Sequence, residues 1–396
     1  MTDLLPLDEA LGIVQSLAHP LGAEAVSIAE AHDRTLACAV IAGIASPRND
    51  SSAMDGYAVQ DSDVENLPAS LRVTGESFAG TPQPPALGTG EAVRIFTGAP
   101  VPAGADRVVI QENCSRDGVM LTVHECGPGR HIRQAGGDFK AGDELLPAGT
   151  RLTARALVAA AGADLAQLSV VRRPRVAILS TGDELVPPGE AQGNPGTIPE
   201  SISPALAAMI GEAGGEIVQR DHLPDDMAVL GQRAQQALHK ADLVVVTGGA
   251  SVGERDFAKA MFGSDLALLF NKVAIKPGKP VWLGRRNGTL ILGLPGNPTS
   301  ALVTARLFLV PLVSGLAGRA TGGALDWRDA LAGAAFPPVG SRETLARARW
   351  VDGRLVPLGS QDSSSQFMLM FADVLVRRRA DAPEARPGDR LGYLDF

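Results

Sequence analysis

This chain of 396 residues has few cysteines and few aromatic side chains, and it carries no net positive charge. The three cysteines (Cys38, Cys114 and Cys126) have no C-x-x-C spacing, which argues against a disulfide framework or a zinc knuckle and indicates reduced thiols in a cytoplasmic protein. Aromatic residues make up only 4%, so the cores must be mainly aliphatic. A net charge of −8 argues against nucleic acid or an anionic membrane surface as the main partner.

Signals for secretion, for a membrane span and for common hydrolases are missing as well. The start "MTDLLPLDEAL" carries three acids and a proline before residue 10, unlike a signal peptide. The most apolar stretch, residues 301–318, contains Arg306 and Pro311 and therefore predicts a core helix rather than a membrane span. The histidines are scattered without metal-ligand spacing, and no Ser-His-Asp pattern can be recognised.

The first part of the chain predicts a helix followed by a small β domain. Residues 7–17 place leucine and valine at helical spacing. From about residue 45 to 133, short β-rich runs alternate with Gly/Pro turns, and Asp117-Gly118 is a hairpin signal. A second helix is expected after Thr153, which can cap it, and should end at Gly162.

From about Val171 the pattern alternates between strand and helix. Runs such as "RVAILS" and "ADLVVVTGG" are too apolar to have a wet face, and Ser203-Pro204 suggests a helix start. This alternation predicts a doubly wound parallel sheet that helices cover on both sides. The tail from Trp327 is expected to be β again, with a hairpin at Asp352-Gly353.

Three unusual loops follow predicted strands of this sheet. They are "LSTGDEL" (179–185), "TGGASVGERDF" (247–257) and "GLPGNPTS" (293–300). Ligands of open parallel sheets bind beyond the carboxyl ends of the strands, glycine lets the backbone approach a ligand closely, and a helix start offers free N–H groups. Each loop taken alone is equally compatible with an ordinary turn. If the three loops lie at the same edge of one sheet, they predict a phosphate site.

Charged residues near these loops suit the same kind of ligand. Lys276 and Lys279 on "IKPGKP" are either a solvated pair or two point charges for an oxyanion. Mg²⁺ takes one or two carboxylates together with waters and phosphate oxygens. The residues alone therefore predict a site for an anionic, phosphate-bearing small molecule with Mg²⁺. The carboxylates on the loops are Asp183, Glu184, Glu254 and Asp256.

The segment "DSSAMDGYAV" (50–59) has two interpretations. Asp55-Gly56 is either a tight turn between two strands or a carboxylate held out for a ligand. These ten residues do not decide between the two.

Six motifs, in order, resemble the molybdopterin molybdenumtransferase family, which includes bacterial MoeA and the gephyrin E domain. They are "SSAMDGYAV", "RIFTGAPVPAGADRVVIQE", "LSTGDEL", "TGGASVGERDF", "IKPGKP" and "LPGNP", and the match runs from about residue 5 to the C-terminus. The resemblance implies an elongated helical dimerisation domain, an inserted β domain, a molybdopterin-binding α/β domain and a C-terminal β domain. Their expected ranges are 1–45 with 133–172, 46–132, 173–319 and 320–396.

The resemblance also implies an activity and partners. Adenylylated molybdopterin would bind with Mg²⁺, molybdate would enter, the pyrophosphate link would be cleaved with release of AMP, and molybdenum would join the dithiolene sulfurs. A homodimer would share each active site between subunits, so that dimerisation brings Asp55 to the partner's α/β domain. Molybdopterin adenylyltransferase and molybdoenzyme maturation proteins would be further partners.

Individual residues acquire roles from the same resemblance. Lys276 and Lys279 would hold molybdate or the substrate phosphate. The acids that position Mg²⁺ and the pyrophosphate would be Asp55, Asp138, Glu184 and Asp256, with Glu184 and Asp256 as metal ligands. Other substrate-binding positions would be Thr97, Thr181, Gly182, Gly248, Gly249, Ser251, Pro295 and Pro298, of which Gly248, Gly249 and Ser251 would donate to the pterin phosphate.

Two positions depart from the family pattern. Gly137 stands where the family often has a glutamate, and Ile202 stands where it often has an asparagine. The two changes keep open a non-catalytic protein that carries molybdopterin. A molybdopterin adenylyltransferase is a further alternative, because that enzyme contains the same α/β module.

Overall fold

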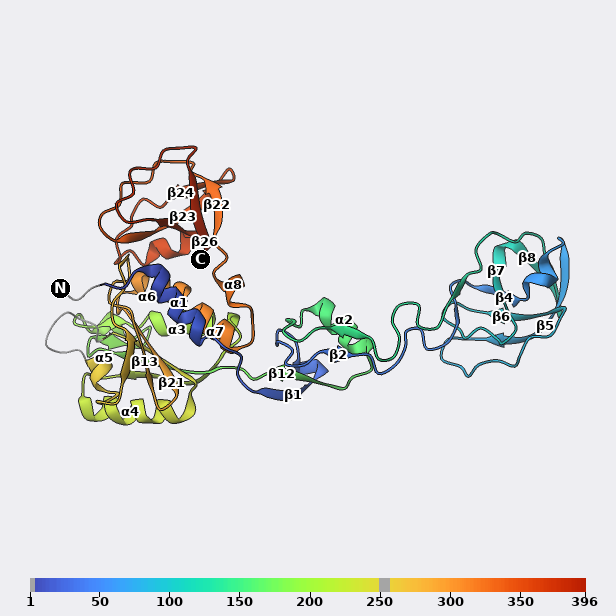
Figure 1. Ribbon diagram of the computed structural model, residues 1–396, viewed down its shortest axis with the longest axis horizontal. Helices are drawn as coiled ribbons and strands as arrows, with labels where there is room; N and C mark the ends of the chain where they lie inside the picture. The colour runs from blue at the N-terminus through green and yellow to red at the C-terminus, as the bar shows by residue number, and fades with distance from the viewer. Residues whose placement is uncertain (1–3, 249–256) are drawn as a thin grey trace.

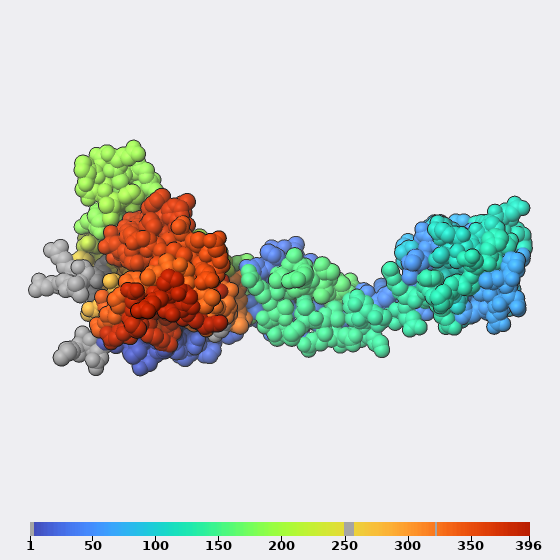
Figure 2. All heavy atoms as spheres, turned by 90° about the horizontal axis from the view of Figure 1, so that it is seen from above, coloured from blue at the N-terminus to red at the C-terminus, as the bar shows by residue number. Residues whose placement is uncertain are grey.

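The computed structural model describes residues 4–248 and 257–396, which form an elongated molecule (Figure 1). At one end lies an α/β domain with a β domain beside it, and at the other end lies a separate β domain (Figures 1 and 2). A narrow middle segment joins the two ends. The chain runs through the middle segment twice, because the distal β domain is inserted between its halves. The multidomain α/β and β architecture predicted from the sequence is confirmed.

The distal β domain is a six-stranded sheet with an apolar core on each face. Its strand order is β7-β4-β6-β5-β9-β8, and residues of β4 and β6 contribute to both cores. The predicted hairpin at Asp117-Gly118 is confirmed, since Asp117 pairs with Met120 and Gly118 has φ +57°. The strands are β4 (Gly56–Val59), β5 (Ala69–Ser77), β6 (Glu91–Ile95), β7 (Arg107–Ile110), β8 (Cys114–Asp117) and β9 (Met120–Val123), with β3 (Ser51–Ser52) and β10 (Ile132–Arg133) paired at the domain's entrance.

The middle segment consists of two antiparallel strand pairs, one α-helix and a short 3₁₀ helix (Ile28–Glu30), so it is less helical than expected. Helix α2 (Ala154–Gly162) starts and ends where the sequence predicted, and the Thr153 hydroxyl accepts a hydrogen bond from the Ala156 N–H. Its apolar residues form a small core with the strands. The strand pairs are β1 (Ala23–Ser27) with β12 (Gln167–Val171) and β2 (Val40–Ile41) with β11 (Glu144–Leu146).

The α/β domain is built on a second six-stranded sheet that is buried on both faces. Val176 and Ile178 of β13 belong to one core cluster, whereas Ala177 and Leu179 belong to another. Neighbouring residues of a strand point to opposite faces, so both faces are covered, as predicted. The elements are β13 (Arg175–Thr181), α3 (Ile202–Glu212), β16 (Glu216–Leu223), α4 (Met227–Lys240), β17 (Leu243–Thr247), α5 (Phe257–Ala260), β18 (Ala267–Phe270), β20 (Trp282–Arg286) and β21 (Thr289–Leu294), with the short pair β14 (Leu185–Val186) and β15 (Ile198–Pro199).

Two details of this domain differ from the prediction. The sheet is not wholly parallel: β13, β16, β17 and β21 run parallel, but β20 and β18 are antiparallel to their neighbours. Helix α3 begins at Ile202 rather than at Ser203-Pro204. The Glu200 carboxylate explains the earlier start, because it accepts the N–H groups of Ile202 (3.0 Å) and Ser203 (2.8 Å).

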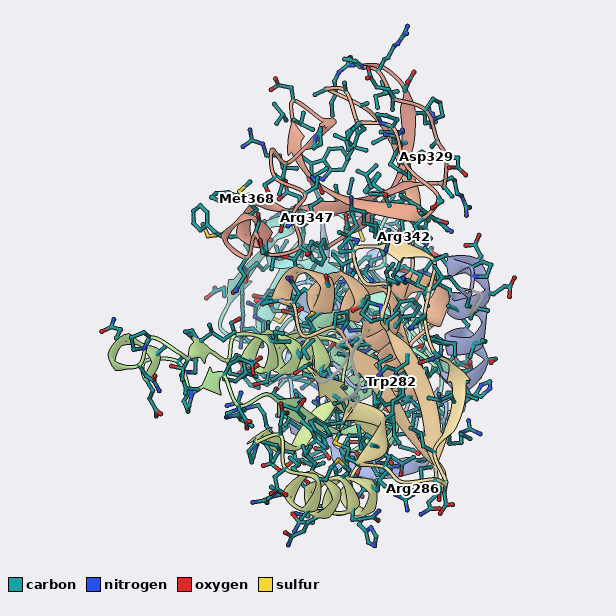
Figure 3. The ribbon with its side chains drawn as sticks, turned by 90° about the vertical axis from the view of Figure 1, so that its left-hand side faces the viewer. Trp282, Arg286, Asp329, Arg342, Arg347 and Met368 are labelled. Atoms are coloured by element: carbon teal, nitrogen blue, oxygen red, sulfur yellow. The ribbon has the colours of Figure 1, made fainter. Side chains whose placement is uncertain are left out.

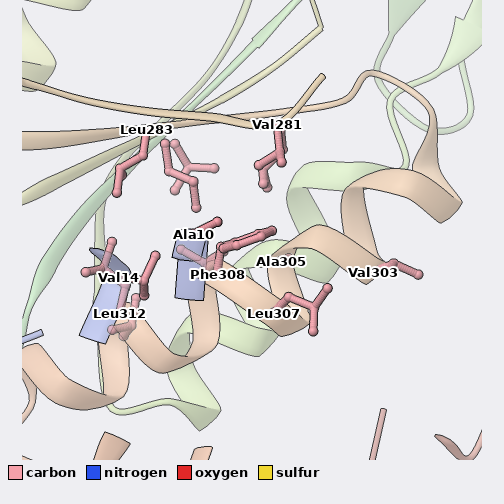
Figure 4. Packing of buried hydrophobic residues seen from close by; sticks show 14 of the residues in the cluster. Ala10, Val14, Val281, Leu283, Val303, Ala305, Leu307, Phe308 and Leu312 are labelled. Carbon is pink, nitrogen blue, oxygen red and sulfur yellow. The ribbon is translucent and has the colours of Figure 1, made fainter. Parts of the chain in front are cut away.

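The apolar helix near the end of this domain lies in its core. The segment Pro298–Leu316 comprises α6 (Pro298–Thr304), a π-helical turn (Ala305–Leu309) and α7 (Val310–Leu316). By length and composition it is able to cross a membrane, but 83% of its apolar window is buried, which confirms the predicted core helix. Helix α1 (Leu7–Leu17) packs against it through Ala10 and Val14 (Figure 4). Within the range 1–45, α1 therefore packs with the α/β domain and not with the middle segment.

The C-terminal β domain adjoins the α/β domain (Figure 1). The predicted hairpin at Asp352-Gly353 is confirmed, with both residues at positive φ. Strand β19 (Ile275–Lys276) comes from the α/β part of the chain but pairs with β23 (Glu343–Val351), which ties the lysine segment to this domain. The remaining elements are α8 (Thr321–Ala324), β22 (Arg328–Leu331), β23 (Glu343–Val351), β24 (Arg354–Pro357), a 3₁₀ helix (Phe367–Phe371), β25 (Val374–Arg378) and β26 (Arg390–Asp395).

Candidate active site

Three adjacent strands of the α/β domain end together. In the parallel register Ser180 lies opposite Thr247, and Thr247 lies opposite Leu294. The loops that follow approach each other closely: a Cβ on Gly248 would lie 2.3 Å from the Thr181 carbonyl oxygen. Gly248 also has φ +88°, so this position requires glycine for two independent reasons. The expected gathering of "LSTGDEL" and "GLPGNPTS" at one sheet edge is therefore observed.

Polar side chains continue beneath this edge. The Thr247 hydroxyl donates to Ser180 Oγ (3.1 Å), and Ser180 lies 3.5 Å from a Glu200 carboxylate oxygen. Glu200 is only 7% exposed, yet it accepts the α3 N–H groups and the Ser203 hydroxyl. This capping role of Glu200 was not predicted from the sequence. Ile202, by contrast, points into the apolar core.

The two acids of the "TGDEL" loop differ in their contacts. Asp183 accepts the Asp225 N–H (3.0 Å), which ties this loop to the residues after β16. Glu184 is exposed, and its carboxylate lies beside Gly182, where a Cβ would be 2.7 Å from Oε2. Glu184 thus offers one of the one or two carboxylate ligands that Mg²⁺ takes beside waters and substrate oxygens. Gly249, Ser251 and Asp256 lie outside the described residues, and among those described no group of three metal-ligating side chains occurs.

The loop between β21 and α6 presents polar atoms without partners. Pro295 is buried and Pro298 half-buried, so the loop is held firmly. Within the described residues, Asn297 Oδ1 and Thr299 Oγ1 are buried without a hydrogen-bond partner. Leaving such an atom unpaired costs roughly 1–3 kcal/mol, which a polar ligand would recover. The sequence highlighted this loop but did not single out Asn297 or Thr299.

The lysine segment is positioned between the two domains. Lys276 and Lys279 are exposed, and a Cβ on the intervening Gly278 would lie 2.3 Å from Thr304 of α6. Lys276 also lines a cavity of about 290 Å³ at the C-terminal β domain, together with Arg342. The segment is therefore held by α6 on one side and by β23 on the other, and its ammonium groups are available for an anion.

A buried arginine, Arg347, belongs to the same basic region as Lys276 and Arg342, and it was not predicted. Arg347 is fully buried and donates to the carbonyls of Ser360 (3.2 Å) and Asp362 (3.0 Å). Two further nitrogens of Arg347 are buried without a partner in the described part of the chain. Hydrogen bonds from Ser364 lower the pKa of Asp362, and the charges of Arg347 and Lys276 add to this. Arg342 and Arg347 lie on the side of the C-terminal domain that faces the α/β domain (Figure 3).

The segment between β24 and the 3₁₀ helix of the C-terminal domain reaches the start of helix α3. Ser201 donates to Gln366 across the two domains (3.2 Å). This contact joins the C-terminal domain to the α/β domain at the residue before α3. A larger cavity of about 770 Å³ lies elsewhere, between Arg151 of the middle segment and Phe396, and none of the predicted site residues lines it.

Asp55 forms a second site with Thr97, in the distal β domain. One Asp55 carboxylate oxygen accepts both the Thr97 N–H (2.7 Å) and the Thr97 hydroxyl (2.9 Å). These two hydrogen bonds lower the pKa of Asp55, and the Arg94 charge adds to them. The hairpin interpretation of Asp55-Gly56 is wrong, since β3 and β4 do not pair with each other. Gly56 instead permits close strand packing: a Cβ there would lie 1.9 Å from the Val109 carbonyl oxygen.

Asp138 lies apart from both sites, where the middle segment meets the distal β domain. Its side chain is exposed, and its N–H donates to the Ser46 carbonyl (3.0 Å). A Cβ on the preceding Gly137 would lie 3.0 Å from the Gln134 carbonyl oxygen, so the backbone here is tight. Asp55 precedes β4 and Thr97 follows Phe96 at the end of β6, and within one chain both strands lie far from β13 and β21, whose ends carry the strand-end loops (Figure 1).

Comparisons with known proteins place the chain in a family. Residues 5–163 match the model of the MoeA N-terminal region (domain I and II), and residues 177–315 match that of a probable molybdopterin binding domain. The molybdopterin molybdenumtransferase of Haemophilus influenzae is 38% identical over 80% of this chain and 78% of its own. Molybdopterin molybdenumtransferase 2 of Mycobacterium tuberculosis is 40% identical over 72% of this chain and 73% of its own.

A solved structure agrees over the whole chain. The molybdopterin biosynthesis moeA protein from Pyrococcus horikosii superposes with a TM-score of 0.87 at 30% identity, covering 100% of this chain and 99% of that one. The fold and these relatives together define a multidomain enzyme, whose candidate site lies at the edge of an α/β sheet. The chain belongs to the molybdopterin molybdenumtransferase family, whose members are transferases.

Proposed function

We propose that this protein inserts molybdenum into adenylylated molybdopterin, with cleavage of the pyrophosphate link and release of AMP, as the last step of molybdenum cofactor biosynthesis. The observation that carries the proposal is the strand-end site. Glycine-lined loops and two unpaired buried oxygens lie at the strand ends, and the lysine segment packs on α6, the helix that follows one of these loops. This combination suits a ligand with both an anionic phosphate and polar ring atoms.

Each part of the site has a separate task in the proposed reaction. Backbone groups of Thr181, Gly182 and Gly248 receive the pterin phosphate, and Asn297 with Thr299 supplies hydrogen bonds to its polar groups. Lys276 and Lys279 hold molybdate or the substrate phosphate as point charges. Mg²⁺, held by Glu184 with Asp256, would neutralise charge on the phosphate oxygens as the link breaks. Positioning by these groups supplies most of the acceleration.

We further propose a homodimer in which each active site uses both subunits. Asp55 is exposed, and in the described part of the chain the hydrogen bonds to its carboxylate come from Thr97, which holds it in one orientation. A partner's strand-end loops, placed against the distal β domain, would give Asp55 and Asp138 a phosphate group to position. An adenylyltransferase would supply the substrate, and molybdoenzyme maturation proteins would accept the product.

Release of AMP tests the proposed function. The purified protein, incubated with adenylylated molybdopterin, molybdate and Mg²⁺, should release AMP, which chromatography detects. A folded dimer that binds the pterin tightly but releases no AMP would contradict the proposal and support the carrier alternative. Pyrophosphate release from ATP and molybdopterin would support an adenylyltransferase instead.

A further inference from the structure

Two phenylalanine rings form an exposed stack beside Asp55. Phe78 directly follows β5 and Phe96 directly follows β6; their ring centroids are 4.7 Å apart with 11° between the planes. Phe78 is 44% exposed, although large apolar side chains usually lose most of their exposure on folding. The stack is thus a flat aromatic surface that meets solvent.

The stack is held rigidly by its neighbours. The Arg94 guanidinium carbon lies 4.7 Å from the Phe96 ring centroid and 5.0 Å from that of Tyr57. Arg94 also donates to the Gly56 carbonyl (3.1 Å) and to Gln111 (2.5 Å). The backbone N–H of Phe96 donates to the Ser77 carbonyl (3.2 Å), which fixes one ring relative to the other. A preorganised surface of this kind loses little entropy when it binds a ligand.

Only one peptide unit separates this stack from the Asp55 site. Thr97, which follows Phe96, gives both of its donors to the Asp55 carboxylate. Gly98 in turn lies against the loop after Phe78, where its Cβ would be 3.7 Å from Ala79 Cβ. A carboxylate assigned to the pyrophosphate and an exposed aromatic surface therefore lie side by side on one end of the domain.

We propose that Phe78, supported by Phe96, is the stacking surface for the adenine of the adenylylated substrate and of the AMP product. The inference rests on the proposed function, because that function places a pyrophosphate next to Asp55. In such a substrate only a ribose lies between the phosphate and the adenine, so the base reaches the surface beside the phosphate site. Stacking a base on an aromatic side chain is worth roughly 1–3 kcal/mol, which corresponds to about 5- to 150-fold in affinity.

The test compares two ligands that differ only in the base. Isothermal titration calorimetry gives the dissociation constants of AMP and of ribose 5-phosphate for the dimeric protein with molybdate and Mg²⁺. The wild type should bind AMP at least about fivefold more tightly. Phe78→Ala should bring this ratio close to one, whereas Phe78→Tyr should preserve it. Phe367→Ala is the matched control, because Phe367 is 73% exposed on the C-terminal domain and should leave the ratio unchanged.

The outcomes separate this inference from the proposed function. In turnover, Phe78→Ala should raise KM for adenylylated molybdopterin with little change in kcat. A wild-type ratio near one, no AMP binding, or an unchanged ratio in a folded Phe78→Ala dimer overturns the stacking surface. A dimer that Phe78→Ala dissociates while the ratio per subunit persists also overturns it and makes Phe78 a subunit contact. Base-dependent AMP binding without AMP release would leave the stacking surface in place and remove the proposed function.

Discussion

Replacing Ile202 by asparagine should destabilise the α/β domain instead of improving the site. The family pattern suggests that asparagine restores a lost amide, but Ile202 is only 6% exposed and packs in the main core. Burying an isoleucine side chain contributes roughly 1.5–3 kcal/mol. A buried amide without partners costs about 1–3 kcal/mol. Ile202→Asn should therefore lower the free energy of unfolding by about 3–5 kcal/mol and leave activity no higher.

Urea unfolding measures this loss directly. Trp282 is fully buried in the same domain, so its fluorescence reports unfolding there when Trp327 and Trp350 are replaced by phenylalanine. With a slope of roughly 1–3 kcal/mol per molar urea, the midpoint should fall by more than about 1 M. Ile202→Val, which keeps the residue apolar, should cost only about 0.5–1.5 kcal/mol. An Ile202→Asn protein that is as stable as the wild type and more active would refute this packing argument.

Two further predictions concern carboxylates. Burial raises the pKa of Asp33, but its hydrogen bonds and ion pairs with Arg151 and Arg319 outweigh this and hold the pKa below the usual 3.8. The carboxylate therefore adds stability above pH 3.8, and this stability is lost as the pH falls through the lower pKa of the folded state. In thermal unfolding, Asp33→Asn should be less stable than the wild type at pH 7 and should lose less stability on acidification. Equal pH dependence of the two proteins would contradict this. Thr97→Val removes one hydrogen bond that lowers the pKa of Asp55, so the acidic limb of the pH–rate profile should move to higher pH. Thr97→Ser keeps the hydroxyl and should leave this limb in place. Profiles of Thr97→Val and wild type that superimpose would show that Asp55 does not set the acidic limb.

The sequence predicted the parts of the fold that depend on local pattern. Apolar runs such as residues 243–247 predicted buried strands, and Asp-Gly pairs predicted the two hairpins. Strand direction is not encoded in such runs, so the antiparallel β18 and β20 were missed. The packing of α1 on the α/β domain depends on contacts between residues about 300 positions apart in the sequence, which periodicity does not reveal.

The candidate site was predicted to a similar extent. Glycine and proline marked the strand-end loops, because their backbone requirements are local. The bond between Asp55 and Thr97 joins residues 42 positions apart, and only the folded domain brings them together. Arg347 was missed because an arginine in a predicted hairpin is expected to face solvent, whereas here it is fully buried.

Mixing two inactive variants tests most directly whether each active site is shared between subunits. Asp55→Ala and Glu184→Ala should each abolish turnover, because the proposed site needs one carboxylate from each chain. Random exchange of subunits makes half of the dimers mixed, and each mixed dimer then holds one intact site. The mixture should recover about a quarter of wild-type AMP release. No recovery, despite subunit exchange verified by native mass spectrometry, would contradict the account.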